Sequence, residues 1–238
     1  MKIIKPIILI AGLAIALGST ANAQGSGAGI VGSPHDFTDN VGMASGLEVG
    51  VGGWNAREEV CRVCHVPHDH NRAQAYGDAG LLWNHALSTA TYTLYTSDTM
   101  DVTATQPTGF SKMCLGCHDG TVGVDTFDRY TGGTVFIGDY NDGFQVPGAL
   151  FAGTLANTHP ISIVYDPALD PGLQPVTALM GGSGTIDDVL EGGVLQCSSC
   201  HDVHDQPGES VAGTHLLRVN QKASTGTASG LCLTCHIK

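Results

Sequence analysis

Hydrophobic residues along this 238-residue chain rarely recur with the period of a long amphipathic helix. The clearest apolar run, Ile7 to Leu17, follows a basic start at Lys2 and Lys5 and precedes the small residues Ala21-Asn22-Ala23. This layout predicts a cleaved secretory signal peptide over residues 1–23. Because the run is shorter than the about 20 apolar residues of a membrane-spanning helix, we expect an exported, soluble mature chain from Gln24 onward.

The remaining pattern predicts only short regular elements. Three helices are expected from a capping residue and the segment after it: 56–65 after Asn55, 114–118 after Ser111, and 186–191 after Thr185, with Gly192-Gly193 ending the last. Two β-rich runs, Gly133–Ile137 and Ile161–Tyr165, predict a small hairpin or two isolated strands. The chain has 33 glycines and 6% aromatic residues, so we expect a mostly irregular fold with short α-helices and little β-structure.

All eight cysteines belong to four copies of Cys-x-x-Cys-His. Two cysteines three residues apart lie on one side of a helical turn, where both thiols can add to the vinyl groups of one porphyrin. The next residue then presents its imidazole to the iron, and this spacing is the attachment signature of a c-type haem. The copies are Cys61, Cys64 and His65; Cys114, Cys117 and His118; Cys197, Cys200 and His201; and Cys232, Cys235 and His236.

Paired cysteines also have three other interpretations: a disulfide framework, a structural zinc site and a redox-active dithiol. Disulfides would not need a histidine after every second cysteine, and two cysteine pairs already complete a tetrahedral zinc site. We therefore expect four covalent c-type haems, with the motif histidines as proximal ligands. Residues 24–238 are expected to form one tetrahaem domain whose haem stack supplies much of the core: an arm over 24–54, haems 1 and 2 over 55–193, and a doubled motif over 194–238.

Seven histidines lie outside the motifs and are candidates for the distal face of the irons. Five are favoured, His35, His68, His85, His159 and His204, and two are held in reserve, His70 and His215. Methionine ligation would raise the reduction potential and is the alternative, with Met43, Met100, Met113 and Met180 in the mature chain. Because histidine is abundant, we expect two histidines on every iron.

The spacing of these histidines limits which iron each can reach. His68 and His204 follow a proximal histidine by three residues, too close to reach the distal face of the same haem, so each would serve a neighbouring one. We expect His204 on the fourth iron and His68 on the second. His85 and His159 would be carried in on loops, and His35 on the N-terminal arm. The alternative for each is an ordinary surface histidine.

The chain resembles the OmcE type of extracellular tetrahaem cytochromes. The likeness extends over nearly the whole mature chain, through Ser33–Phe37, Cys61–His68, Leu82–His85, Cys117–Thr121, His159-Pro160, Leu216–Val219 and Leu231–His236. Residues 197–236 also resemble a doubled Cys-x-x-Cys-His module that is widespread in other cytochromes.

This resemblance implies closely stacked haems that run continuously through a conductive filament, or nanowire, with one iron taking a histidine from the adjacent subunit. His35 is the favoured donor across that interface. It further implies an extracellular or cell-surface location, reached through the periplasm. The partners would be other copies of the chain, redox-partner cytochromes and extracellular electron acceptors such as metal oxides. A head-to-tail contact that does not close into a ring produces such a helical polymer.

The net charge of the chain disfavours some classes of binding partner. The formal net charge is −12, which disfavours nucleic acid or an anionic lipid surface as a partner. We expect electron transfer and no enzyme, because an iron with two histidines has no open position for a substrate. Two alternatives remain: a discrete periplasmic electron shuttle with every ligand in one chain, and a multihaem oxyanion reductase with one open iron lined by basic residues.

Overall fold

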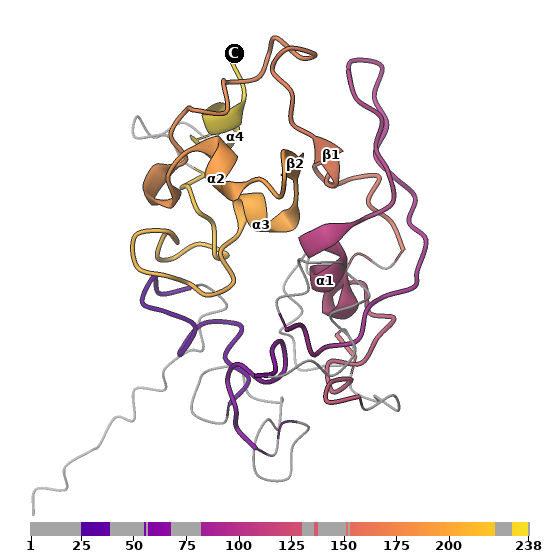
Figure 1. The fold of residues 1–238 in the computed structure, drawn as a ribbon, viewed down its shortest axis with the longest axis vertical. Helices are drawn as coiled ribbons and strands as arrows, with labels where there is room; N and C mark the ends of the chain where they lie inside the picture. The colour runs from indigo at the N-terminus through magenta and orange to yellow at the C-terminus, as the bar shows by residue number, and fades with distance from the viewer. Residues whose placement is uncertain are drawn as a thin grey trace, which may run out of the picture.

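The structure is a computed structural model that describes residues 25–38, 55, 57–67, 82–129, 136–137, 151, 153–221 and 230–237. Most of these residues lie in turns and loops, and the few short helices are joined by long irregular connections (Figure 1). The expectation of a mostly irregular chain with short helices and little β-structure is confirmed. The elements, in chain order, are α1 (Gly109–His118), β1 (Ile163–Val164), the 3-10 helix η2 (Gly181–Ser183), α2 (Ile186–Val189), β2 (Val194–Leu195), α3 (Cys197–Cys200) and α4 (Gly230–Cys235).

No helix within the described ranges is both long and apolar enough to span a membrane. The predicted signal peptide, residues 1–23, lies outside these ranges.

Helix α1 begins earlier than the sequence indicated. Thr108 is extended and precedes the first turn, where the amide of Phe110 donates to Glu191 Oε2 at 2.9 Å. A carboxylate at this end of a helix satisfies a free amide and complements the helix dipole. Gly109 has φ of +49°, and a Cβ there would overlap the Glu191 carboxylate, so the glycine is required. Ser111 is therefore not the cap; it lies buried inside the helix.

The prediction for α2 is confirmed at its start. Thr185 precedes the helix, and both its amide and its hydroxyl donate to Asp188 Oδ2, at 2.8 and 2.7 Å. The helix ends at Val189 rather than 191, because Leu190 is already extended. Strand β1 lies in the predicted run 161–165, but it pairs antiparallel with β2, with Ile163 opposite Leu195. Of the other run, residues 136 and 137 are not in a strand, and 133–135 lie outside the described residues.

The predicted helix over 56–65 is wrong. Glu58 has φ of +52°, a left-handed conformation that an α-helix cannot contain, and residues 60–64 form turns. Asn55 does not cap a helix through its side chain; its Nδ2 donates to the carbonyl of Phe37 at 2.6 Å. A tertiary hydrogen bond to the N-terminal segment therefore replaces the capping interaction that the local sequence predicts.

Apolar packing in the described chain is divided between two small clusters. One centres on Tyr92, Leu115 and Leu155, and the other on Tyr165, Ile186 and Leu195. Among the described residues, 16 polar or charged side chains are buried against 13 hydrophobic ones, the reverse of an ordinary core. Hydrogen bonds between buried polar groups thus hold these loops together at least as much as apolar contact does.

One buried polar cluster joins α1, α3 and β1. The hydroxyls of Ser111 and Ser162 both donate to Gln196 Oε1, at 2.5 and 3.0 Å. The amide of Cys197 in turn donates to Ser111 Oγ at 3.0 Å. All three side chains of this Ser111–Ser162–Gln196 cluster are buried. Because α1 and α3 carry two of the cysteine motifs, the cluster fixes those motifs relative to each other.

Replacing Gln196 with Ala should destabilise the protein by about 2 kcal/mol, because two buried hydroxyls lose their shared acceptor. Equilibrium denaturation of the purified full chain, followed by circular dichroism, measures the change. Gln206→Ala is the control: its side chain is exposed, so we expect a change below about 0.5 kcal/mol. Equal effects of the two substitutions would contradict the role of the cluster.

Candidate haem-ligand sites

The four cysteine motifs share one local geometry. Helices α1, α3 and α4 carry the second, third and fourth motifs, and the first lies on consecutive turns. In the first, third and fourth motifs the histidine amide donates to the carbonyl of the first cysteine, at 2.7, 3.1 and 2.9 Å. These bonds close one helical turn, so both cysteines and the histidine lie close together even where no helix continues.

Three of the four motif histidines face a histidine from elsewhere in the chain. The ring centroids are 6.3 Å apart for His65 and His204 and 6.2 Å apart for His159 and His236. The rings of His35 and His118 are separated by 6.1 Å. Each pair thus joins one motif histidine to one of the distal candidates.

This separation fits one metal ion between each pair of rings. A metal–imidazole bond is about 2 Å long and the ring centre lies about 1.1 Å beyond the nitrogen, so two imidazoles on opposite sides of one ion have centres about 6.2 Å apart. Aromatic rings in ordinary contact also have centres about 4.5–7 Å apart, so what distinguishes these pairs is that each joins a motif histidine to another histidine. The three pairs are therefore spaced as two axial ligands of one iron would be.

In His159 and in the third motif's His201, a hydrogen bond occupies one ring nitrogen and leaves the other available. His159 Nδ1 lies 2.9 Å from the carbonyl of Pro160, and His201 Nδ1 lies 2.8 Å from the carbonyl of His215. A carbonyl only accepts, so each Nδ1 carries the proton and Nε2 presents its lone pair. Such bonds orient metal-binding histidines in general.

Burial favours the neutral, metal-binding form of His35 and, again, of His201. Desolvation, followed by the proximity of His118, lowers the pKa of His35 to about 3. Its Nδ1 is buried without a hydrogen-bond partner. Desolvation also lowers the pKa of His201. A neutral imidazole is the form that ligates iron.

The eight motif cysteines form no disulfides. Burial raises the pKa of Cys64 to about 12 and that of Cys200 to about 11. The thiols of Cys114 and Cys197 lie close enough to shift each other's pKa, upward for Cys114 and downward for Cys197, so the second and third motifs are neighbours.

The third motif differs from the others. Within the part of the chain that the structure describes, no histidine ring is paired with that of His201. Arg218 lies close enough to lower the pKa of His201. Its guanidinium, however, is bonded to Glu209 Oε2 at 3.0 Å, to Ser183 Oγ at 3.0 Å and to the carbonyl of Ser198 at 2.8 Å.

Residues Leu82–His85 connect the first two motifs. The ring of Trp83 meets that of His65 edge-on at 5.9 Å, and Asn84 Nδ2 donates to the carbonyl of Arg62 at 2.6 Å. His85 is buried, with its ring nitrogens 2.8 and 3.1 Å from the carbonyls of Ala86 and Gly123 and its Nε2 3.5 Å from Cys117 Sγ. The structure therefore places this distal candidate against the second motif's cysteine, outside the three ring pairs.

Not every candidate can be placed. His68 and His70 lie outside the described residues, as does Met43. His215 is exposed, and its carbonyl accepts from His201. Met113 and Met180 are buried, and Met100 is partly exposed. No group of three or more histidine, cysteine or acidic side chains that could hold a bare metal ion occurs among the described residues.

A feature that the sequence reasoning missed is a buried aspartate directly after four histidines. Asp36, Asp119, Asp202 and Asp205 follow His35, His118, His201 and His204, and each is at most 3% exposed. Asp119, for example, accepts from Tyr92 OH at 2.5 Å, from Thr121 N at 2.8 Å and from Ser88 Oγ. Although burial opposes it, these hydrogen bonds lower the pKa of Asp119. The sequence signal that could have revealed these aspartates is the repeated His-Asp dipeptide.

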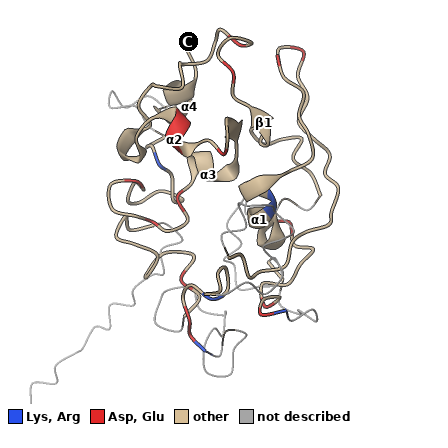
Figure 2. Cartoon of the chain, viewed as in Figure 1, with Lys and Arg blue, Asp and Glu red and all other residues tan. Residues whose placement is uncertain are grey.

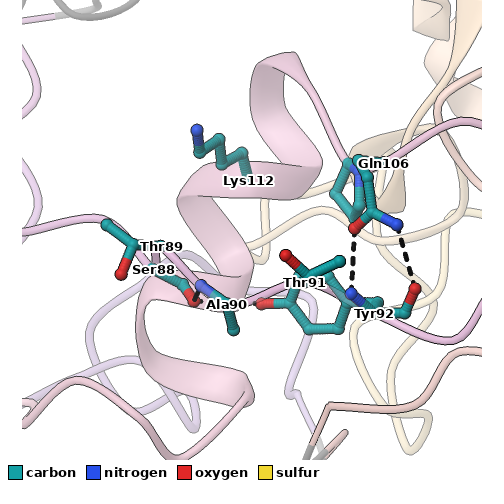
Figure 3. A pocket seen from close by; sticks show the side chains of 8 residues that line it. Ser88, Thr89, Ala90, Thr91, Tyr92, Gln106 and Lys112 are labelled. Carbon is teal, nitrogen blue, oxygen red and sulfur yellow. Dashed lines mark hydrogen bonds between the residues drawn. The ribbon is translucent and has the colours of Figure 1, made fainter.

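The groove beside α1 is a separate feature. It has a volume of about 180 Å³ and is lined by the segment Ser88–Tyr92 together with Gln106, Pro107 and Lys112 (Figure 3). Gln106 closes one side by hydrogen bonds to the backbone of Tyr92, both 2.9 Å long. Its lining contains no histidine or cysteine, so it is not one of the candidate ligand sites.

No protein-family model matches the chain, and no curated protein matches it significantly.

Proposed function

We propose that this chain is an exported tetrahaem c-type cytochrome that transfers electrons through closely spaced irons, each held by two histidines. The observation that carries the proposal is the set of three ring pairs at 6.1–6.3 Å, each combining a Cys-x-x-Cys-His histidine with a distant one. Random surface histidines would not pair selectively with motif histidines at the spacing of two axial ligands. The haem, when bound, supplies one-electron exchange between ferric and ferrous iron.

The geometry supports a specific ligand assignment. We assign His204 to the first iron with His65, His35 to the second with His118, and His159 to the fourth with His236. The sequence-based expectation instead put His204 on the fourth iron, His68 on the second and His35 across the interface to a neighbouring copy. The assignment proposed here follows the ring pairs of His204 with His65 and of His35 with His118, and His68 lies outside the described residues.

The chain's own residues would set the properties of each iron. Two neutral imidazoles on one iron leave no position for a substrate, which favours electron transfer over catalysis. Because Cys114 and Cys197 lie close to each other, they would hold haems at the second and third motifs as neighbours. The segment His201–His204 would contribute one ligand to the third site and one to the first, and so would link the two sites.

We further propose that copies of the chain assemble head to tail into an extracellular filament, with a histidine of a second copy completing the third site. Support comes from the resemblance to the OmcE type of cytochromes over nearly the whole mature chain. His201 has no ring partner among the described residues, which do not include His68 and His70. The net charge of −12 suits basic redox-partner cytochromes and metal oxides as electron acceptors. In the described part of the chain, Asp and Glu positions are spread along the loops and on α2, and Lys and Arg positions are fewer (Figure 2).

The oxyanion-reductase alternative needs a free cation near an open iron. Arg218 is the basic residue whose charge affects His201, and its guanidinium is already engaged by Glu209, Ser183 and Ser198. An anion would have to displace these contacts to bind there. The discrete electron shuttle differs from the filament only in the source of the third distal ligand.

Haem loading is the first test. The chain expressed with a c-type haem maturation system should carry four covalent haems, as measured by intact-mass spectrometry of the denatured protein. Cys→Ala at both cysteines of one motif should remove one haem, because the porphyrin loses its thioether bonds. A wild-type chain of unmodified mass would contradict the proposal.

Replacing one paired distal histidine should expose one iron. His35→Ala, His159→Ala and His204→Ala should each convert one haem from low spin to high spin and let the reduced protein bind one additional CO per chain. Asn157→Ala, an exposed change two residues from His159, is the control and should bind no more CO than wild type. An unchanged CO stoichiometry in all three histidine variants would contradict the assignment.

Assembly should be visible in the third site. Haem-stained filaments should be found by electron microscopy outside cells that express the chain, and their disassembly should raise the high-spin signal by one iron per chain. Discrete particles with four low-spin irons would instead support the shuttle. Particles with one open iron that turn over an oxyanion would support the reductase.

A further inference from the structure

The part of the N-terminal arm that the structure describes as one segment, residues 25–38, is attached to the loop 202–216 of the same chain. The amide of Gly25 donates to the carbonyl of Thr214 at 3.0 Å, and the amide of Gly213 donates back to Gly25 at 2.9 Å. The amide of Gly29 donates to the carbonyl of Asp205 at 2.6 Å. The arm is thus hydrogen-bonded to this loop at several successive positions.

The carboxylate of Asp205 is the centre of this attachment. It is fully buried, and its Oδ2 accepts from the amides of Ser26 and Gly27 at 2.7 and 2.9 Å and from Ser26 Oγ at 3.3 Å. Gly25 packs so closely that an added Cβ would lie 2.5 Å from both Asp205 Oδ1 and Leu216 Cδ2. The glycine is therefore required for the arm to approach the aspartate.

The arm continues from this anchor into a tight turn that carries His35. Ser33 N donates to the carbonyl of Ile30 and Asp36 N to that of Ser33, both at 3.0 Å. Asp36 Oδ2 closes the turn by accepting from Gly32 N at 2.9 Å. Few free torsions remain between Gly29 and His35, so an anchor at one end fixes the histidine at the other.

We propose that Asp205 is a positioning residue that holds His35 against the second haem site, although its own sequence neighbour, His204, faces the first. This inference rests on the proposed function. Loss of the carboxylate leaves two arm amides and one hydroxyl without their acceptor, so the attachment of the arm is weakened to its backbone hydrogen bonds with the loop. CO then displaces His35 from the iron more readily, because keeping His35 bound carries the entropic cost of ordering the loosened segment before it.

The test is a CO titration of the reduced, haem-loaded full chain, with haem content checked by mass spectrometry. Asp205→Ala should retain four haems and bind one CO more per chain than wild type, with a matching gain of one high-spin iron. His35→Ala should do the same. The double variant should still bind only one CO more than wild type, because both changes release the same ligand.

Two further variants separate the anchor from general damage to the loop. Gly25→Ala disturbs the contact from the arm side and should reproduce the Asp205→Ala result. Ala28→Ser changes an exposed arm residue and should match wild type. Asp202→Ala removes a buried carboxylate that accepts from His204 N and Gln206 N within its own loop and does not contact the arm. The double variant of Asp202→Ala and His35→Ala should therefore bind an amount of extra CO equal to the sum of the two single variants.

Two results would overturn this role alone: an Asp205→Ala protein with four haems that binds no more CO than wild type, or a double variant that binds two more. The second result would mean that Asp205 acts on another ligand, such as His204. A wild-type chain without covalent haem would overturn the proposed function itself and this role with it.

Discussion

The arrangement of the candidate sites depends on the buried contact between α1 and α3. The hydroxyls of Ser111 and Ser162 both donate to Gln196 Oε1, and the amide of Cys197 donates to Ser111 Oγ. Both helices begin or end within a cysteine motif, so a shift in this cluster would move the second and third motifs together. Polar groups suit this task because a buried hydrogen bond is directional, whereas an apolar contact tolerates sliding.

The same preference for polar contacts extends over the described loops. Buried aspartates follow His35, His118, His201 and His204, and each accepts at least two hydrogen bonds from its surroundings. Such carboxylates set the backbone conformation of irregular segments, which have no helical or sheet ladder to do so. If the chain surrounds large apolar cofactors, as proposed, its loops would need such buried carboxylates to hold their conformation, because its own apolar clusters are small.

The proposed ligand pairs would explain the long irregular connections, because each pair joins two distant parts of the chain. His204 lies 139 positions beyond His65, and His118 lies 83 positions beyond His35, so each pair would close a long loop through one iron. Closing long loops is entropically costly in the unfolded chain, and metal ligation offsets that cost. Under this proposal the folding of the chain and the loading of its haems are one process.

The cysteine motifs, the histidine that follows each of them and the low content of regular structure follow from the sequence, because they depend on residue type and short spacing. The start of α2 was also predictable, since Thr185 and Asp188 interact within one turn. The helix after Asn55 was predicted wrongly because Asn55 bonds to Phe37 instead of capping. Which distant histidine faces which motif required the tertiary structure: His35, His159 and His204 are equivalent in type, and only the folded loops bring each to one partner. The anchoring role assigned to Asp205 likewise depends on an arm 178 residues away in sequence, a separation across which no local pattern carries information.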